Sequence, residues 1–271
     1  QLSTFYPGGV KTADTFLVVP ISIIPGALDI SNSDGSLMAL ICTSMPSSMR
    51  LSLFLMLKSV FDGLDISRIR LLCLFLKKPF RCTHFSHWNR YGLTGHTALQ
   101  GVHPHDLEAA GGRRTNLRQT LPYTGESEFD SNNYLLMVNQ ISHHLPDEYK
   151  VLVKLVDILP NAEGSLVRHF LSLVVNINVC MVAHRDAKDF ELCLVLAVGE
   201  FTGGGLVMKE QGLVAELRNG DFAIFRSGET THFNLDYLDG RASLVMHTDG
   251  GFKTWEKDRN GWKNHSHFTY L

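Results

Sequence analysis

The sequence predicts a mainly β fold with flanking helices, an α+β protein whose core over about residues 165–249 is an antiparallel jelly roll (double-stranded β-helix). Two observations carry this prediction. From residue 165 onward, short runs alternate hydrophobic and polar side chains with a period of two, and glycine-rich turns separate the runs. Strand-like runs spaced about 8–12 residues apart, with no helical pattern between them, are typical of antiparallel sandwiches and jelly rolls.

The expected elements begin and end at recognisable signals. Turn-forming residues occur at 202–205 (Thr-Gly-Gly-Gly), 211–212 (Gln-Gly), 219–221 (Asn-Gly-Asp) and 239–240 (Asp-Gly). They bound expected strands at 173–183, 192–198, 206–209, 213–217, 222–225 and 241–247. Ahead of the strands, Pro146 is expected to begin a helix, because apolar residues follow at helical spacing until Pro160.

The first 80 residues differ in character from the rest. They are apolar and basic, and the runs at 51–61 and 69–76 have helical length but no clean polar face. Two interpretations stay open: a buried segment of unusual composition, or a stretch misassigned in the gene model. We therefore divide the chain into an N-terminal segment, 1–80, and a domain, 81–271, whose first part up to residue 130 is rich in loops.

Net charge and the apolar runs bear on two classes of partner, nucleic acid and membrane. The net charge is −2, so no overall field attracts nucleic acid, and any phosphate contact must come from a local patch. The apolar runs at 16–24 and 36–61 are interrupted by Pro20 and by Pro46 and Arg50. Neither reaches the roughly 20 uninterrupted apolar residues of a membrane helix. We therefore expect an intracellular protein without membrane contact.

The cysteines predict reduced thiols. Their number, five, is odd, and no two have C-x-x-C spacing, which argues against a disulfide framework. A zinc site formed by Cys82, His84 and His87 is an alternative, although the spacing is irregular and no fourth ligand is evident. The five are Cys42, Cys73, Cys82, Cys180 and Cys193.

One pattern indicates a metal centre. Residues i and i+2 of an extended chain point to the same side, so His184 and Asp186 can reach one ion from a single strand end. His232, 46 residues later and beyond four expected strands, is the expected third ligand. Two imidazoles and a carboxylate form the facial triad of non-haem Fe(II) oxygenases. A second H-x-D pair, His247 with Asp249, is followed by only 22 residues, too few to return a strand to the metal.

A fixed cation accompanies this triad. Arg241 and Ser243 lie on one face of the last expected strand, and Val245 continues the alternation that points this face inward. An inward-facing arginine needs a buried anion. The distal carboxylate of 2-oxoglutarate is such an anion, and a guanidinium with a neighbouring hydroxyl would bind it. The sequence therefore predicts an Fe(II)- and 2-oxoglutarate-dependent oxygenase.

These residues resemble a known family. The blocks at 184–186, 201–205, 219–221, 231–234 and 241–245 resemble fungal members of the TET/JBP oxygenases, and the likeness extends over about residues 88–262. The resemblance implies oxidation of the methyl group of a modified DNA base by O₂, with Fe(II) as the metal and 2-oxoglutarate as cosubstrate. It also implies that the substrate base is flipped out of the duplex into the pocket.

The resemblance further implies which residues contact the ligands. Asp189 and Asp249 stand where the animal enzymes carry the base-recognising Asn and His, and here both are acidic. A carboxylate at either place could accept a hydrogen bond from an exocyclic amine. The other expected contacts are Asn178 to the cosubstrate, His247 and Arg90 to the substrate, and Arg113, Arg114 and Arg118 to the DNA backbone.

Two other functions stay open. A 2-oxoglutarate oxygenase that acts on a protein or a small molecule would share the triad and Arg241. A catalytically dead jelly-roll binding module is the second, although it has no reason to keep all four residues. The sequence leaves open whether the base is 5-methylcytosine, thymine or 6-methyladenine. A nuclear location follows only from the suspected substrate, and no obligate protein partner is inferred.

Overall fold

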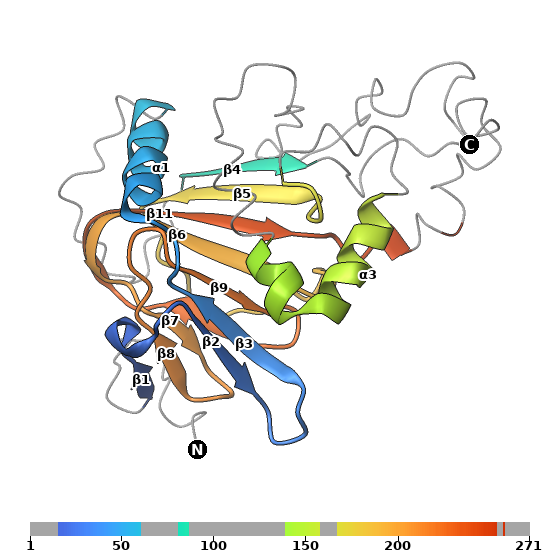
Figure 1. Ribbon diagram of the computed structural model, residues 1–271. Helices are drawn as coiled ribbons and strands as arrows, with labels where there is room; N and C mark the ends of the chain where they lie inside the picture. The colour runs from blue at the N-terminus through green and yellow to red at the C-terminus, as the bar shows by residue number, and fades with distance from the viewer. Residues whose placement is uncertain (1–15, 61–80, 87–138, 158–166, 254–256, 258–271) are drawn as a thin grey trace, which may run out of the picture.

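The computed structural model describes residues 16–60, 81–86, 139–157, 167–253 and 257, with the backbone alone at 56–60, 81–86 and 155–156. Two β-sheets dominate it (Figure 1). The larger has the strand order β2-β3-β9-β6-β11-β5-β4, and the smaller β1-β8-β7-β10. The strands are β1 Leu17–Val19, β2 Ala27–Ser31, β3 Leu37–Cys42, β4 Arg81–Ser86, β5 Ser172–Ile177, β6 Cys193–Gly203, β7 Leu206–Met208, β8 Leu213–Ala215, β9 Phe222–Phe225, β10 His232–Asn234 and β11 Tyr237–His247.

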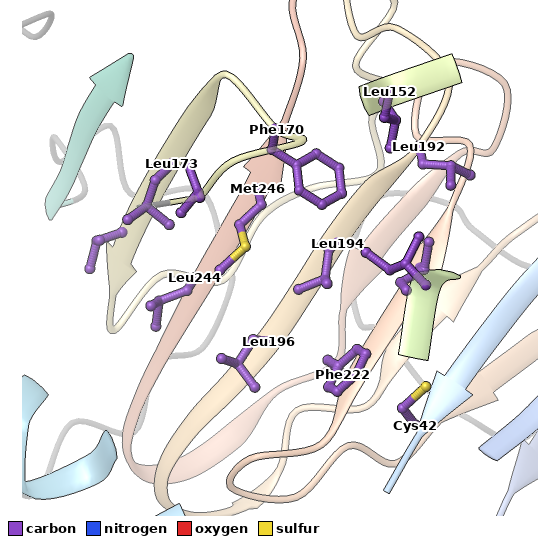
Figure 2. Packing of buried hydrophobic residues seen from close by; sticks show 14 of the residues in the cluster. Cys42, Leu152, Phe170, Leu173, Leu192, Leu194, Leu196, Phe222, Leu244 and Met246 are labelled. Carbon is purple, nitrogen blue, oxygen red and sulfur yellow. The ribbon is translucent and has the colours of Figure 1, made fainter. Parts of the chain in front are cut away.

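One face of the seven-stranded sheet is covered by helices. Helix α1 (Ser47–Val60) contributes Leu53 and helix α3 (Pro146–Val156) contributes Leu152 to a cluster with residues such as Leu194 of β6. Figure 2 shows this cluster, in which side chains from β3, β5, β6, β9 and β11 meet those of α3. Because strand side chains alternate, the neighbours of Leu194 point to the opposite, inner face.

The inner face packs against the four-stranded sheet. Val195 and Ala197 of β6 and Phe225 of β9 share a second buried cluster with Leu206 of β7 and Ala215 of β8. Val245 of β11 packs against the same cluster, so the alternate residues of β11 lie between the two sheets. This space between the sheets is where the candidate site lies.

The N-terminal segment is part of this fold. β2 and β3 form a hairpin, and β3 pairs with β9, so the hairpin extends the larger sheet (Figure 1). β1 pairs in parallel with β8 in the smaller sheet. The described part of the first 80 residues, 16–60, therefore contributes strands to both sheets, and the division of the chain at residue 80 stays a prediction. Of the two interpretations, a buried segment of unusual composition is the one that agrees with these contacts.

An ion-pair cluster anchors α1 to the turn before β9. Arg50 Nη2 lies 2.7 Å from Oδ1 of the fully buried Asp221, and the other guanidinium nitrogens donate to backbone carbonyls, with Nε 2.7 Å from the Met45 carbonyl. Gly220 is required beside it, since a Cβ there would lie 2.5 Å from Arg50 Cγ. These contacts explain why an apolar, basic segment folds onto the sheet.

Several element bounds differ from the expectation. β5 ends at Ile177 because Asn178 has φ +53°, a left-handed conformation that ends the strand. α3 starts at Pro146 as expected but ends at Val156, and residues 139–144 are helical as well. β10 was not expected, because three residues show no alternation. The expected helix at 69–76 lies outside the described residues.

The cysteine expectation needs one correction. Cys42 and Cys193 are free and buried, and burial raises the pKa of Cys42 to about 12. Cys180 is disulfide-bonded, so the expectation of reduced thiols is wrong for this residue. Within the described part of the chain, no helix is both long and apolar enough to span a bilayer.

Candidate metal centre

Two histidines from distant segments are paired directly through their backbones. His184 follows the loop after β5, and His232 begins β10. The backbone N–H of His184 donates to the carbonyl of His232 at 3.1 Å, and the N–H of His232 donates to the carbonyl of His184 at 2.9 Å. This isolated antiparallel bridge places the two rings on one side, with their centroids 4.3 Å apart.

Asp186 completes a three-ligand group. Its carboxylate lies 3.8 Å from Nε2 of His184 and 3.5 Å from Nε2 of His232. All three ligand atoms lie within 4.8 Å of one another. Donors that each lie about 2.1 Å from one ion are at most about 4.2 Å apart, so both carboxylate distances are compatible with a shared metal. The donor set suits a divalent transition metal with open positions.

Both imidazoles are oriented by their own chain. Nδ1 of His184 lies 2.8 Å from the carbonyl of Val182, and Nδ1 of His232 lies 3.1 Å from the carbonyl of Thr230. A carbonyl only accepts, so each Nδ1 carries the hydrogen and each Nε2 is left with its lone pair for a metal. Burial and the neighbouring His184 lower the pKa of His232, which favours this neutral form.

Among the described residues, Arg241 is a buried cation without an anion. Its side chain is 2% exposed, and neither Nε nor Nη2 has a hydrogen-bond partner. The rings of Phe201 and Tyr237 lie 5.3 and 5.7 Å from the guanidinium carbon, and the Tyr237 hydroxyl is also buried without a partner. Burial lowers the pKa of Arg241 to about 10 and raises that of Tyr237 to about 12. Unpaired buried donors are costly, and a carboxylate would satisfy them.

A glycine makes room for this guanidinium. Gly204 has φ +70°, and a Cβ there would lie 3.2 Å from both Cδ and Nε of Arg241 and from Cβ of Tyr237. Any larger residue would therefore press on the arginine. The expected glycine turn at 202–205 thus has a second role, because it borders the candidate anion site.

The predicted cosubstrate residues separate into two groups. Ser243 is buried on the inner face of β11, and its hydroxyl lies 3.5 Å from Nδ2 of Asn176 on β5. Asn178 instead uses its side-chain oxygen to accept the backbone N–H of Arg241 at 3.1 Å, while its own N–H donates to the Arg241 carbonyl. Asn178 therefore fixes the backbone of β11 at Arg241. Sequence reasoning missed Asn176 as the neighbour of Ser243. The alternation of side chains along β5 could have identified it.

The predicted base contacts are bonded to one another. Asp189 Oδ1 lies 2.8 Å from Nδ1 of His247, and Oδ2 accepts the Ser227 hydroxyl at 2.8 Å. Burial acts to lower the pKa of His247, but the hydrogen bond and charge of Asp189, with Asp186 and Asp249, raise it above its ordinary value. Both oxygens of Asp189 are thus engaged.

Asp249 pairs with Asp189 in a backbone bridge, and its carboxylate accepts the N–H of Gly251 at 2.7 Å. Arg90, Arg113, Arg114 and Arg118 lie outside the described residues, as does His87 of the zinc alternative. Cys82 and His84 lie on β4, where the backbone alone is described.

Comparison with known proteins supports the fold. No protein-family model and no curated sequence matches the chain. The solved structure described as NgTET1 in complex with 5mC DNA aligns over 89% of this chain and 85% of its own, with 14% identity and a TM-score of 0.53. A prolyl-4-hydroxylase from Pseudomonas putida aligns over 46% of this chain and 67% of its own, with 20% identity and a TM-score of 0.30. The likeness to NgTET1 confirms the expected fold class, a mainly β protein with a double-stranded β-helix core.

Proposed function

We propose that this chain is an Fe(II)- and 2-oxoglutarate-dependent dioxygenase that oxidises the methyl group of a modified DNA base, with 5-methylcytosine as the expected substrate. One observation carries the proposal: the described residues include both a His-Asp-His group and a buried guanidinium, that of Arg241, whose Nε and Nη2 have no partner among them. A structural arginine would have its anion in the protein. A ligand that must bind a metal and neutralise a guanidinium at once is a dicarboxylate such as 2-oxoglutarate.

The chain's own residues divide the work. His184, Asp186 and His232 would hold Fe(II). Arg241, assisted by Ser243, would bind the distal carboxylate of 2-oxoglutarate. Bound iron supplies the redox chemistry, in which 2-oxoglutarate and O₂ become succinate and CO₂ while one oxygen atom enters a C–H bond of the substrate.

Burial serves the same chemistry. Among the described residues, His232 and Arg241 are both buried, whereas His184 and Asp186 are partly exposed, so solvent reaches the group beside His184 and Asp186. A substrate on this side would close the site to water. A base inside a duplex cannot reach such a site, and it would have to be extruded from the stack.

Two arguments support DNA as the substrate: the sequence blocks shared with the TET/JBP oxygenases, and a fold shared with NgTET1, which was solved with 5mC DNA. Oxidation of a DNA base would also place the protein in the nucleus. The test is incubation of the purified chain with Fe(II), 2-oxoglutarate and duplexes containing 5-methylcytosine or 6-methyladenine, followed by mass spectrometry of the nucleosides and of succinate.

The expected result is oxidised 5-methylcytosine with one succinate for each oxidation step of the base, both absent with Asp186→Ala. Thymine in the same duplexes serves as an internal competitor. Succinate formation that responds to peptides but not to DNA would instead support the protein-modifying alternative. No succinate under any condition, together with no metal binding, would support the binding module.

A further inference from the structure

Glu210, in the turn between β7 and β8, contacts both segments that carry the candidate metal ligands. Glu210 Oε1 accepts a hydrogen bond from Arg185 Nη2 at 2.7 Å, and Oε2 accepts the backbone N–H of Thr231 at 2.8 Å. The Thr231 hydroxyl also donates to Glu210 and accepts from Arg185 Nε at 3.0 Å. The three side chains therefore close a ring of hydrogen bonds.

The ring lies beside the ligands along the chain. Arg185 stands between His184 and Asp186, and Thr231 directly precedes His232. Few backbone bonds connect these segments: the bridge between the two histidines, and the N–H of Asp186 to the Ser227 carbonyl at 3.1 Å. The side-chain ring is the further link that spans from the H-x-D segment to the start of β10.

We propose that Glu210 is a positioning residue of the metal centre, whose carboxylate holds the H-x-D segment against the start of β10 at the separation that one ion requires. The inference rests on the proposed metal site but not on the identity of the substrate. Glu210 does not touch the ion. It acts through Arg185 and Thr231 on the neighbouring ligands, as outer contacts of metal sites generally do.

A purely stabilising role predicts a different outcome. The side chains of Arg185 and Glu210 are 49% and 38% exposed. Ion pairs this exposed contribute little to the stability of a fold. The loss of Glu210 should therefore leave the metal-free protein almost as stable as before, while the ligand segments lose their fixed spacing.

The experiment titrates Co(II), as a coloured substitute for Fe(II), into wild type, Glu210→Ala and Glu210→Gln. Visible absorption follows binding, and thermal unfolding of the metal-free proteins is measured in parallel. We expect Glu210→Ala to raise the Kd for Co(II) about tenfold, the lower end for outer contacts of metal sites. Glu210→Gln keeps an acceptor for Thr231 and should raise the Kd about threefold. The melting temperatures should stay within about 2 °C.

A matched control and a double variant sharpen the result. Asp157→Ala breaks an ion pair with Arg168 that has a similar length, 2.9 Å, and similar exposure, 32% and 42%, on another part of the surface. It should leave the Kd for Co(II) unchanged. Arg185→Ala opens the same ring as Glu210→Ala, so the two together should weaken binding little more than either alone.

Two results would overturn the inference: a Kd for Glu210→Ala within twofold of wild type, or a fall in metal-free stability large enough to account for the weaker binding. Either would leave the proposed function standing, provided that the wild type binds one Co(II) per chain. A wild-type protein that binds no Co(II) would overturn the metal centre itself, and with it both proposals.

Discussion

Two arginines in this chain, one partly buried and one fully buried, have opposite surroundings. Arg50, 15% exposed, pairs with the fully buried Asp221 at 2.7 Å and donates through Nη2 to the Thr43 carbonyl at 2.8 Å. Arg241, 2% exposed, has two nitrogens without a partner in the described part of the chain. Burial desolvates both cations, but of the two only Arg50 is paired with an anion among these residues. We infer that the charge of Arg50 stabilises the fold, whereas the charge of Arg241 binds a ligand.

The largest expected effect concerns the uncompensated arginine. Arg241→Met should weaken the binding of 2-oxoglutarate to the metal-loaded protein about 100-fold, because the loss of one partner of a buried charged pair costs about 3 kcal/mol. The affinity of Arg241→Lys should lie between those of wild type and Arg241→Met, since lysine keeps the charge and loses the planar fork. Calorimetric titration measures both. Binding by Arg241→Met within threefold of wild type would mean that another group holds the distal carboxylate.

Removal of the compensated arginine should act on the fold instead. Arg50→Met leaves Asp221 buried with Arg218 as its remaining charged partner, whose Nε lies 2.8 Å away. Breaking a buried ion pair costs about 3–5 kcal/mol, and the remaining partner reduces the expected loss to about 2–3 kcal/mol. Urea unfolding provides the measurement. Lys150→Met, which breaks an exposed pair with Asp147, is the control and should stay within about 0.5 kcal/mol.

The effect of Arg241→Met on the free energy of unfolding should differ in direction from that of Arg50→Met. In the metal-free protein without ligand, Arg241→Met removes an unpaired buried cation, so the free energy of unfolding should stay the same or rise by about 1 kcal/mol. Stability retained while ligand binding is lost is the signature of a binding residue. A loss above about 2 kcal/mol would show that the guanidinium has a structural partner and would weaken the comparison.

The smallest effect is expected at an exposed cation. Lys188 lies two residues after Asp186 and forms no ion pair within the described part of the chain. If DNA is the substrate, Lys188→Ala should weaken duplex binding about threefold and lower the slope of log K against log salt by about one. Fluorescence anisotropy at several salt concentrations measures this, with Lys150→Ala as a control. An unchanged salt dependence would mean that Lys188 does not contact the DNA phosphates.

The candidate His-Asp-His group was accessible to sequence reasoning because the spacing of its residues has a simple cause. Side chains two residues apart on an extended chain point to the same side, so the sequence alone predicted that His184 and Asp186 act as a pair. His232 followed from the strands between. The same alternation selected Arg241 and Ser243, which the structure buries on the face of β11 that also carries Val245.

Other residues could not be assigned from the sequence. The roles of Asn176 and Asn178 depend on where β5 ends, which the left-handed backbone at 178 decides. The engagement of Asp189 by Ser227 and His247 is a long-range contact that no local pattern encodes. Strand β3 was missed because all but its first two residues are buried, so it shows no alternation of polar and apolar side chains.

Calorimetric titration of 2-oxoglutarate into Fe(II)-loaded and metal-free protein, under exclusion of oxygen, tests the central claim most directly. The account predicts one binding event per chain that requires the metal. It also predicts that Asp186→Ala abolishes this event and that Arg241→Met weakens it about 100-fold, since the ligand is held at both ends. Equal binding with and without metal, or binding that neither substitution changes, would contradict it.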